Sequence, residues 1–293
     1  MTDARIITGD ARVRSPAIRY HGAKFRLASW LLQYFPPHDC YVEPYGGAAG
    51  VLVRKPRAYA EVYNDLDGDI VNFFRVLRDP ETRAALIEQL ILTPFARKEF
   101  EGAWEDSADP VERARRTAVR ATFGWGSSSA TKGTTGFRID TKREYALTMH
   151  LWTRYPDAIR VAGERFAGVL IENRPAIECM LQHDGPRTLH FVDPPYVHST
   201  RVMQANGTGY YRHEMTDMDH VHLLAAVQSL RGMVIISGYP TDLYDQALTG
   251  WRRQTRLARA SAGRGTALRT AVIWINQACA AALELGGLPL EAA

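Results

Sequence analysis

The residues best suited to chemistry are Asp193, Pro194, Pro195 and Tyr196, which directly follow a short apolar run, residues 188–192. That run has the β-branched and aromatic composition of a buried strand, and two consecutive prolines cannot continue its hydrogen-bond ladder. The chain must therefore leave the sheet there, with a carboxylate fixed at the carboxyl end of a strand. In open α/β sheets ligands bind at that edge. Taken alone, the four residues fit equally well a strand-ending turn with an Asp cap and a packed Tyr.

This arrangement suits an amino group carried on a planar ring. The Asp193 carboxylate can accept one N–H, the carbonyl of Pro194 can accept the other, and the ring of Tyr196 can stack on the base. Two such hydrogen bonds would aim the lone pair of the amino nitrogen at an electrophile.

A second set of candidate residues lies in the glycine-rich turn at residues 43–50, EPYGGAAG, which opens into a helix. Gly46 and Gly47 allow the backbone to approach a ligand closely at a helix N-terminus. Asp65 follows a predicted strand at residues 58–63, the position that binds ribose hydroxyls in nucleotide-binding folds. Because the turn departs from G-x-G-x-x-G and the sequence has no G-x-x-x-x-G-K-[ST], the pattern favours a nucleotide-like cofactor over a dinucleotide or a phosphate loop.

The elements that would position these residues are strands and helices in the two outer parts of the chain. Strands are predicted at 40–42, 58–63, 169–172, 188–192, 233–237, 251–257 and 270–276, and helices at 25–35 and 217–230. Residues 66–122 are predicted to be mostly helical, residues 124–136 form a Gly/Ser/Thr-rich loop, and residues 137–155 show no clear period. The pattern predicts an α/β sheet domain interrupted by a helical insert.

The composition is that of a soluble globular protein, with 46% apolar residues, 23% charged residues and a net charge of +4. The three cysteines, Cys40, Cys179 and Cys279, are odd in number and far apart, which is typical of a reducing compartment without disulfides. The first residues contain no apolar run, which predicts no signal peptide, and no run approaches the length of a membrane span. We therefore expect a cytoplasmic protein without a membrane partner.

Positive charge is concentrated in two segments of the sequence. Residues 111–143 hold eight Lys and Arg against two acids, and residues 246–283 hold six Arg and no acid. Local basic surface of this kind suits a polyanion, although an ordinary solvated face explains either segment alone.

Four histidines, at positions 198, 213, 220 and 222, raise the question of a metal. His220 and His222 are two residues apart on a predicted helix, so their side chains point to different faces. We therefore expect no metal site.

In type and order, these segments resemble the S-adenosylmethionine-dependent DNA adenine-N6 methyltransferases of the Dam type. That family carries W/Y-x-G-G-K, then E-P-F-x-G-x-G, an acid after the second strand, a target-recognition insert, D-P-P-Y and a late E-V-L-W-x-N strand. The corresponding segments of this chain are residues 20–24, 43–49, 65, 193–196 and 270–276. The resemblance covers residues 18–276 and is weakest in the insert. Ala23 and Ala49 stand where the family usually has glycine.

The resemblance implies a fold and a set of site residues. It implies a Rossmann-like S-adenosylmethionine-dependent methyltransferase domain formed by residues 1–66 and 160–293, with a mostly helical DNA target-recognition insert at residues 67–159. Implied cofactor contacts are Tyr20, Lys24, Pro44, Gly46, Gly47, Asp65 and Asp193. The target adenine would be held by Asp193, Pro194 and Tyr196. Expected DNA contacts are Lys132, Arg138, Lys142 and Arg143.

The implied activity is site-specific transfer of a methyl group from S-adenosylmethionine to the N6 amino group of adenine in double-stranded DNA, with the base flipped out of the duplex. One alternative is methylation of RNA or of a protein amide, against which the order of the motifs argues. Another is a non-catalytic DNA-binding protein on the same scaffold, against which the intact Asp65 and Asp193 argue. A cognate restriction endonuclease is a candidate partner, while the recognition sequence and the oligomeric state are left open.

Overall fold

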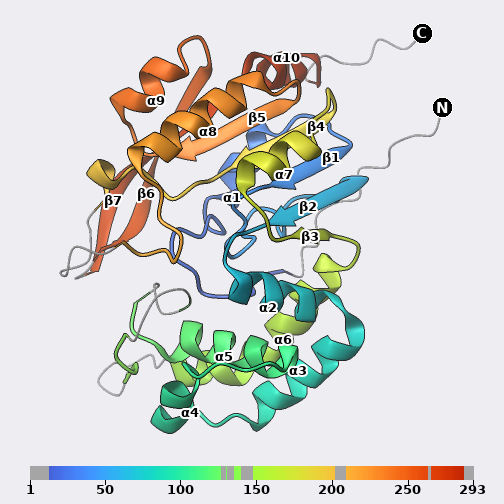
Figure 1. Ribbon diagram of the computed structural model, residues 1–293, viewed down its shortest axis with the longest axis vertical. Helices are drawn as coiled ribbons and strands as arrows, with labels where there is room; N and C mark the ends of the chain where they lie inside the picture. The colour runs from blue at the N-terminus through green and yellow to red at the C-terminus, as the bar shows by residue number, and fades with distance from the viewer. Residues whose placement is uncertain are drawn as a thin grey trace.

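The computed structural model describes residues 13–126, 130, 135–139, 148–201, 209–262 and 265–286. Its strands are β1 (Cys40–Glu43), β2 (Ala60–Asn64), β3 (Leu170–Glu172), β4 (Thr188–Val192), β5 (Met233–Gly238), β6 (Arg252–Ala262) and β7 (Gly265–Ile275). They form one seven-stranded sheet of order β3-β2-β1-β4-β5-β7-β6 (Figure 1). The first five strands are parallel, and β7 runs antiparallel between β5 and β6.

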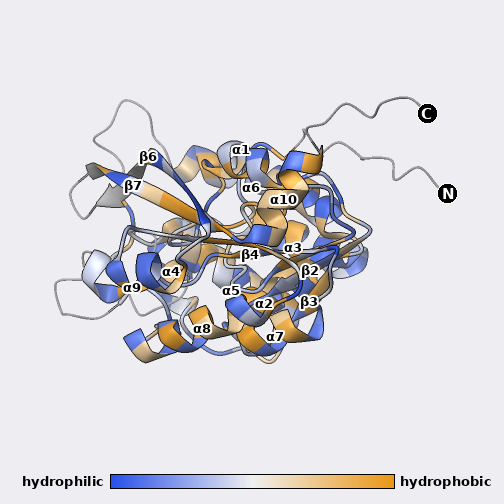
Figure 2. Ribbon diagram, turned by 90° about the horizontal axis from the view of Figure 1, so that it is seen from above, coloured by the Kyte–Doolittle hydropathy of each residue, from blue (hydrophilic) through white to orange (hydrophobic). Residues whose placement is uncertain are grey.

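The centre of the sheet is covered by helices on both faces. Successive strand side chains point to opposite faces, so Phe191 joins one apolar cluster and Val192 joins the other. The helices on the Val192 face are α7 (Ala176–Gln182), α8 (Asp217–Ser229) and α9 (Asp242–Ala247), and those on the Phe191 face include α1 (Ala28–Leu31) and α10 (Gln277–Gly286). Figure 2 shows α7 and α8 on one side of the sheet and α1 and α10 on the other. Burial on both faces explains the continuous apolar runs of β4 and β5.

All seven predicted strands are present, and the two late ones are longer than predicted because they pair with each other as a hairpin. The predicted helix at 217–230 is α8, and the Thr216 and Asp219 side chains cap it reciprocally. The short helices α7 and α9 and the C-terminal helix α10 were not predicted. No helix in the described part of the chain has the length and apolarity needed to cross a membrane.

The predicted helical region forms a separate group of helices at one end of the molecule (Figure 1). These are α2 (Gly68–Arg78), α3 (Pro80–Leu92), α4 (Arg97–Gly102), α5 (Pro110–Phe123) and α6 (Thr148–Phe166). Asp79 and Asp109 accept hydrogen bonds from the first backbone N–H groups of α3 and α5, and each is followed by a proline at the first helical position.

Helix α6 differs from the sequence expectation, which gave residues 137–155 no clear period and placed the end of the insert at residue 159. The helix is continuous through that point. One face of the helix is buried and carries Trp152, Pro156, Ile159 and Phe166. The helical period therefore exists, but it continues past residue 159, the expected end of the insert. Pro156 in the helix interior, normally a helix breaker, obscured the pattern.

Candidate active site

Asp193 directly follows β4, and three side chains converge on its carboxylate. Lys24 places its Nζ 2.8 Å from Oδ2, and the Tyr196 hydroxyl donates to Oδ1 at 3.3 Å. The Ser237 hydroxyl also donates to Oδ1. Ser237 lies near the carboxyl end of β5, which neighbours β4, so both residues lie at the same edge of the sheet. Sequence reasoning missed Ser237, although its position at the end of a predicted strand was an available signal.

Lys24 is held in this position by several contacts. Its ammonium also donates to the carbonyl of Gly22 at 2.8 Å and lies 4.8 Å from the centre of the Tyr196 ring. Burial acts to lower the pKa of Lys24, but the adjacent Asp193 carboxylate outweighs it and raises the pKa above its usual value. Lys24 therefore remains a positively charged partner of Asp193 at neutral pH.

A cavity of about 550 Å³ opens at this edge of the sheet. It lies where the strand order reverses between β1 and β4, which is the usual ligand position in such sheets. All seven residues predicted to contact the cofactor line it: Tyr20, Lys24, Pro44, Gly46, Gly47, Asp65 and Asp193. Pro194 and Tyr196 do not line this cavity. The ring of Tyr196 instead meets that of Tyr239 nearly edge-on, with 4.8 Å between the ring centres.

The glycine-rich turn after β1 forms part of the cavity wall. A Cβ at Gly46 would lie 2.2 Å from the ring of Tyr63, so no larger residue fits there. Gly47 has φ +47°, and its carbonyl accepts from the Tyr63 hydroxyl at 2.7 Å. Ala49, at a position where glycine was expected from the resemblance, has φ +53° and is the only non-glycine residue of the described chain in that region.

Two neighbouring carboxylates face the cavity after β2. Asp65 accepts the backbone N–H groups of Gly47 and Asp67, each at 2.8 Å, and burial raises its pKa to about 6. Asp67 also lines the cavity, and its Oδ2 is buried without a hydrogen-bond partner among the described residues. A buried acceptor without a donor costs free energy until a ligand supplies one. The pair therefore fits a ligand that carries adjacent hydroxyl groups.

Glu43, the last residue of β1, is a further carboxyl group on the cavity wall. It accepts the hydroxyl of Tyr41 at 2.8 Å and the N–H of Leu52 at 3.0 Å. Burial raises its pKa to about 8, with a smaller contribution from the charge of Asp193. Glu43 is therefore mostly neutral at pH 7, so it adds little negative charge beside Asp193.

Residues 209–215, which we call the strap, form part of the cavity wall, which residues 211–215 line. Tyr210 stacks on His21 with 4.2 Å between ring centres, and Arg212 donates to Asp67 at 3.0 Å and to Asp69 at 2.9 Å. Sequence reasoning missed the strap. The available signal was the run Tyr-Tyr-Arg just before the cap of α8.

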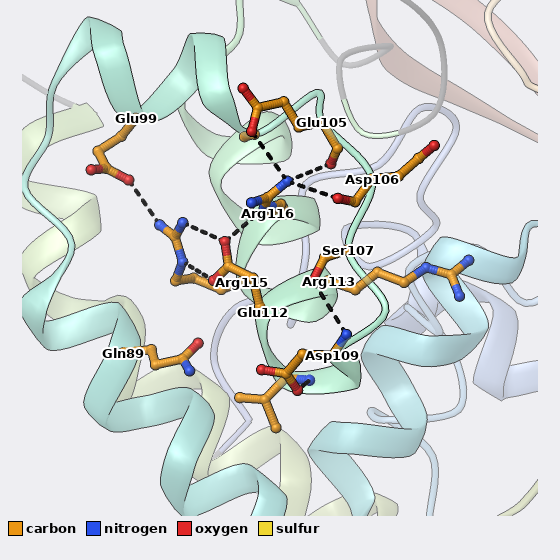
Figure 3. A network of polar contacts seen from close by, with 12 residues as sticks. Gln89, Glu99, Glu105, Asp106, Ser107, Asp109, Glu112, Arg113, Arg115 and Arg116 are labelled. Atoms are coloured by element: carbon orange, nitrogen blue, oxygen red, sulfur yellow. Dashed lines mark hydrogen bonds and ion pairs between the residues drawn. The ribbon is translucent and has the colours of Figure 1, made fainter.

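The basic segment at 111–143 is largely neutralised where it is helical, which corrects the expectation of an unbalanced basic surface. Arg115 contacts Glu112 at 2.6 Å and Glu99 at 2.9 Å, and Arg116 contacts Glu112 at 2.6 Å (Figure 3). Arg113 and Arg120 both contact Asp69, at 2.7 and 2.8 Å. Counting charges within the segment failed because Asp69 and Glu99 come from other helices.

The predicted DNA contacts can be placed only in part. Lys132, Lys142 and Arg143 lie outside the described residues. The backbone N–H of Arg138 donates to the carbonyl of Phe123 at 2.7 Å, next to the bridge that pairs Gly124 with Phe137. The role of these residues in DNA binding stays a prediction.

The histidines on α8 point in different directions, as predicted. His220 is fully buried with Nδ1 2.9 Å from the Tyr244 hydroxyl, whereas His222 lines the cavity. Within the residues that the structure describes, no group of three or more His, Cys, Asp or Glu side chains is placed to hold a metal ion.

A mixed α/β sheet of this order with its cavity at the switch point fits a Rossmann-like methyltransferase. The family model of the D12 class N6 adenine-specific DNA methyltransferases matches residues 20–107, which include Tyr20, the glycine-rich turn and Asp65. Over these residues the chain is similar to the adenine-N6 methyltransferase family, and the match indicates an adenine-specific DNA methyltransferase. A search of curated proteins found no match to the chain.

Proposed function

We propose that the protein transfers a methyl group from S-adenosylmethionine to the N6 amino group of an adenine flipped out of double-stranded DNA. The observation that carries this proposal is that all seven predicted cofactor residues, Asp193 among them, line a single cavity. When bound, S-adenosylmethionine supplies a methyl group on a positively charged sulfur. Everything else in the reaction is done by side chains that bind, orient and exclude water.

The cofactor fits the cavity by the chemistry of its donors and acceptors. The ribose carries two adjacent hydroxyls, and Asp65 with the partnerless Oδ2 of Asp67 offers adjacent acceptors. Gly46 and Gly47 let the backbone approach the ligand closely. Tyr20 and Lys24 line the same cavity, as do residues 211–215 of the strap.

Asp193 would hold the adenine amino group by accepting one of its N–H bonds. A carboxylate offers about four lone-pair positions, and the described contacts of Asp193 come from Lys24, Tyr196 and Ser237. One acceptor position is thus left for the base. These three contacts fix the carboxylate in one orientation, which positions the amino nitrogen for in-line attack on the methyl carbon.

In the proposed transfer, the lone pair of the amino nitrogen would form the bond to the methyl carbon as the bond from that carbon to sulfur breaks, with its electron pair left on sulfur. The nitrogen would then release one proton to water, which restores a neutral amine that carries the methyl group. No covalent enzyme intermediate is needed. Since a stacked base cannot reach Asp193, the adenine must leave the duplex first.

Tyr196 would help to seat the base, as the resemblance implies, but its ring is engaged with Tyr239 and Lys24 here. Stacking of the adenine on Tyr196 would therefore require the base to enter between this ring and the cavity. The role of the insert in gripping the duplex rests on the resemblance and on its position beside the sheet (Figure 1).

The test is a transfer assay with tritium-labelled S-adenosylmethionine and three acceptors: DNA from cells without adenine methylation, total RNA, and a protein extract. We expect label in DNA, recovered after hydrolysis as N6-methyladenine. Label recovered mainly in RNA or protein, or in cytosine of the DNA, would overturn the proposal.

A further inference from the structure

A second hollow, which we call the side groove, lies beside Asp193 and has a volume of about 680 Å³. It is formed by the residues after β5, the segment that follows Tyr196, and part of β7. The side chains that line it are mostly polar and include Ser199, Thr200, Tyr239, Thr241, Arg269 and Thr270. None of these residues contributes to the cofactor cavity.

The side groove is separated from Asp193 by one pair of aromatic rings. Tyr239 lines the groove, and its ring centre lies 4.8 Å from that of Tyr196. The hydroxyl of Tyr196 in turn lies 3.3 Å from Oδ1 of Asp193. A strand that presents a base to Asp193 must therefore leave its backbone close to this groove.

The wall of the side groove formed by β7 is an open strand edge. Pairing of β7 with β5 ends at Val272, opposite Gly238, whereas pairing with β6 continues to Gly265. The hairpin therefore extends beyond the end of β5. Residues 268–270, which line the groove, have no strand partner on that edge among the described strands. Backbone groups, hydroxyls and a guanidinium are together the groups that contact phosphates in protein–DNA complexes.

The charge of this region also favours a polyanion. Residues 246–283 contain no acid, and within the described ranges no carboxylate forms an ion pair with Arg269. This contrasts with the arginines of α5, each of which has an acidic partner. One carboxylate, Asp242, does line the groove. Its negative charge opposes the binding of a phosphate, so its removal should strengthen that binding.

We propose that the side groove holds the sugar–phosphate backbone of the DNA strand that carries the target adenine, with a phosphate on Arg269. This inference rests on the proposed function, because it assumes that the protein binds duplex DNA. The hydroxyls of Ser199, Thr200, Thr241 and Thr270 supply further hydrogen bonds to phosphate oxygens. Such contacts fix the register of the strand and carry no base specificity.

The experiment measures duplex affinity of the full-length protein over a range of salt concentrations, with a short synthetic adenine-containing duplex as the probe. Arg269→Ala should weaken binding about threefold to tenfold and reduce the log–log salt slope by about 0.9, the value for one lost phosphate contact. Arg269→Lys should retain the slope, because the positive charge remains. Asp242→Asn should strengthen binding, because it removes a negative charge beside the phosphate.

Arg252→Ala is the matched control. It removes an exposed arginine of the same hairpin. Arg269 pairs with Ala258 of β6, and Arg252 lies six residues from Ala258 along that strand, a distance of about 20 Å. We expect its salt slope to equal that of the parent. Equal losses of duplex affinity in the two alanine variants would indicate a diffuse basic surface in place of a specific groove. An unchanged salt slope in Arg269→Ala would show that Arg269 makes no phosphate contact.

Turnover separates this inference from the proposed function. In Arg269→Ala the KM for duplex should rise while kcat and cofactor affinity remain at parental values, with an unchanged melting temperature as the folding control. If the parent methylates no adenine but Arg269→Ala still flattens the salt slope, the groove stands and the proposed function fails. If the parent methylates adenine and Arg269→Ala binds duplex as the parent does, the groove fails alone.

Discussion

Asp65 is a carboxylate whose burial opposes its charge. Burial raises its pKa to about 6, although two backbone N–H groups and the charge of His213 act to lower the pKa. In the ligand-free protein this charge is destabilising. Because folding raises the pKa of Asp65, the free energy of unfolding falls as pH rises from the pKa of the unfolded chain towards 6. A buried, poorly compensated acid that lines a cavity is typical of a group kept for a ligand.

We therefore predict that S-adenosylmethionine binds more tightly as pH rises through about 6, because the ionised Asp65 is the stronger acceptor for hydroxyl groups. Asp65→Ala should weaken binding at pH 8 by about 1–3 kcal/mol. Calorimetric titration of the parent, Asp65→Ala and Asp65→Asn between pH 5 and pH 8, roughly the range that brackets that pKa, gives the test. A parental pH profile in Asp65→Asn would show that another group titrates.

Ala49 offers a second residue-scale prediction, because its φ of +53° is unfavourable for any side chain. Ala49→Gly should leave stability unchanged or raise it by up to about 1 kcal/mol, since relief of strain offsets the greater freedom of glycine in the unfolded chain. Ala48→Gly, at the adjacent buried position where φ is not positive, should lower stability by roughly 0.5–1 kcal/mol. Urea unfolding of both variants tests the difference, and a larger loss in Ala49→Gly would contradict it.

At the scale of elements, the strap and the helical insert meet at one carboxylate. Asp69, near the start of α2, contacts Arg113 and Arg120 of α5 and Arg212 of the strap. These contacts hold the pKa of Asp69 down to about 2 against the effect of its burial. The same cluster thus fixes α5 against α2 and joins the strap to α2 at the cavity wall.

This arrangement predicts that Arg212→Ala weakens cofactor binding about fivefold or more, because the strap loses its contacts to Asp67 and Asp69. Arg113→Ala is the matched control, since it removes a contact to the same carboxylate from α5, outside the cavity lining. We expect it to leave cofactor affinity near the parental value. Calorimetry on both variants, with melting temperatures to check folding, decides the point, and equal losses of affinity would assign the effect to Asp69 rather than to the strap.

The sequence was most informative where local rules apply. Two prolines mark the end of β4, Asp-Pro pairs mark the starts of α3 and α5, and residues at strand ends were expected to meet because parallel strands share an edge. Contacts between distant segments were not predicted. The contact of Ser237 with Asp193 and the place of the strap at the cavity wall had only indirect signals in the sequence, and the acids that neutralise α5 depend on tertiary packing that no local pattern encodes.

At the scale of the whole molecule, the proposed cofactor site and the proposed adenine site lie at one edge of the sheet. The cofactor cavity lies over β1, β2 and β4, Asp193 lies at its side, and the side groove continues past Tyr239 to the hairpin of β6 and β7. The helices α2 to α6 lie at the end of the molecule beyond the sheet (Figure 1). A duplex approaching this edge can therefore contact the insert and the hairpin while one base reaches Asp193.

The most direct test of this account is the amount of N6-methyladenine formed in unmethylated duplex DNA by the parent and by Asp193→Ala, measured by mass spectrometry after incubation with S-adenosylmethionine. The account predicts N6-methyladenine with the parent and a loss of at least about a hundredfold in rate with the variant, because the reacting nitrogen loses its oriented acceptor. Circular dichroism should show that the variant remains folded. Near-parental formation of N6-methyladenine by a folded Asp193→Ala protein would contradict the account.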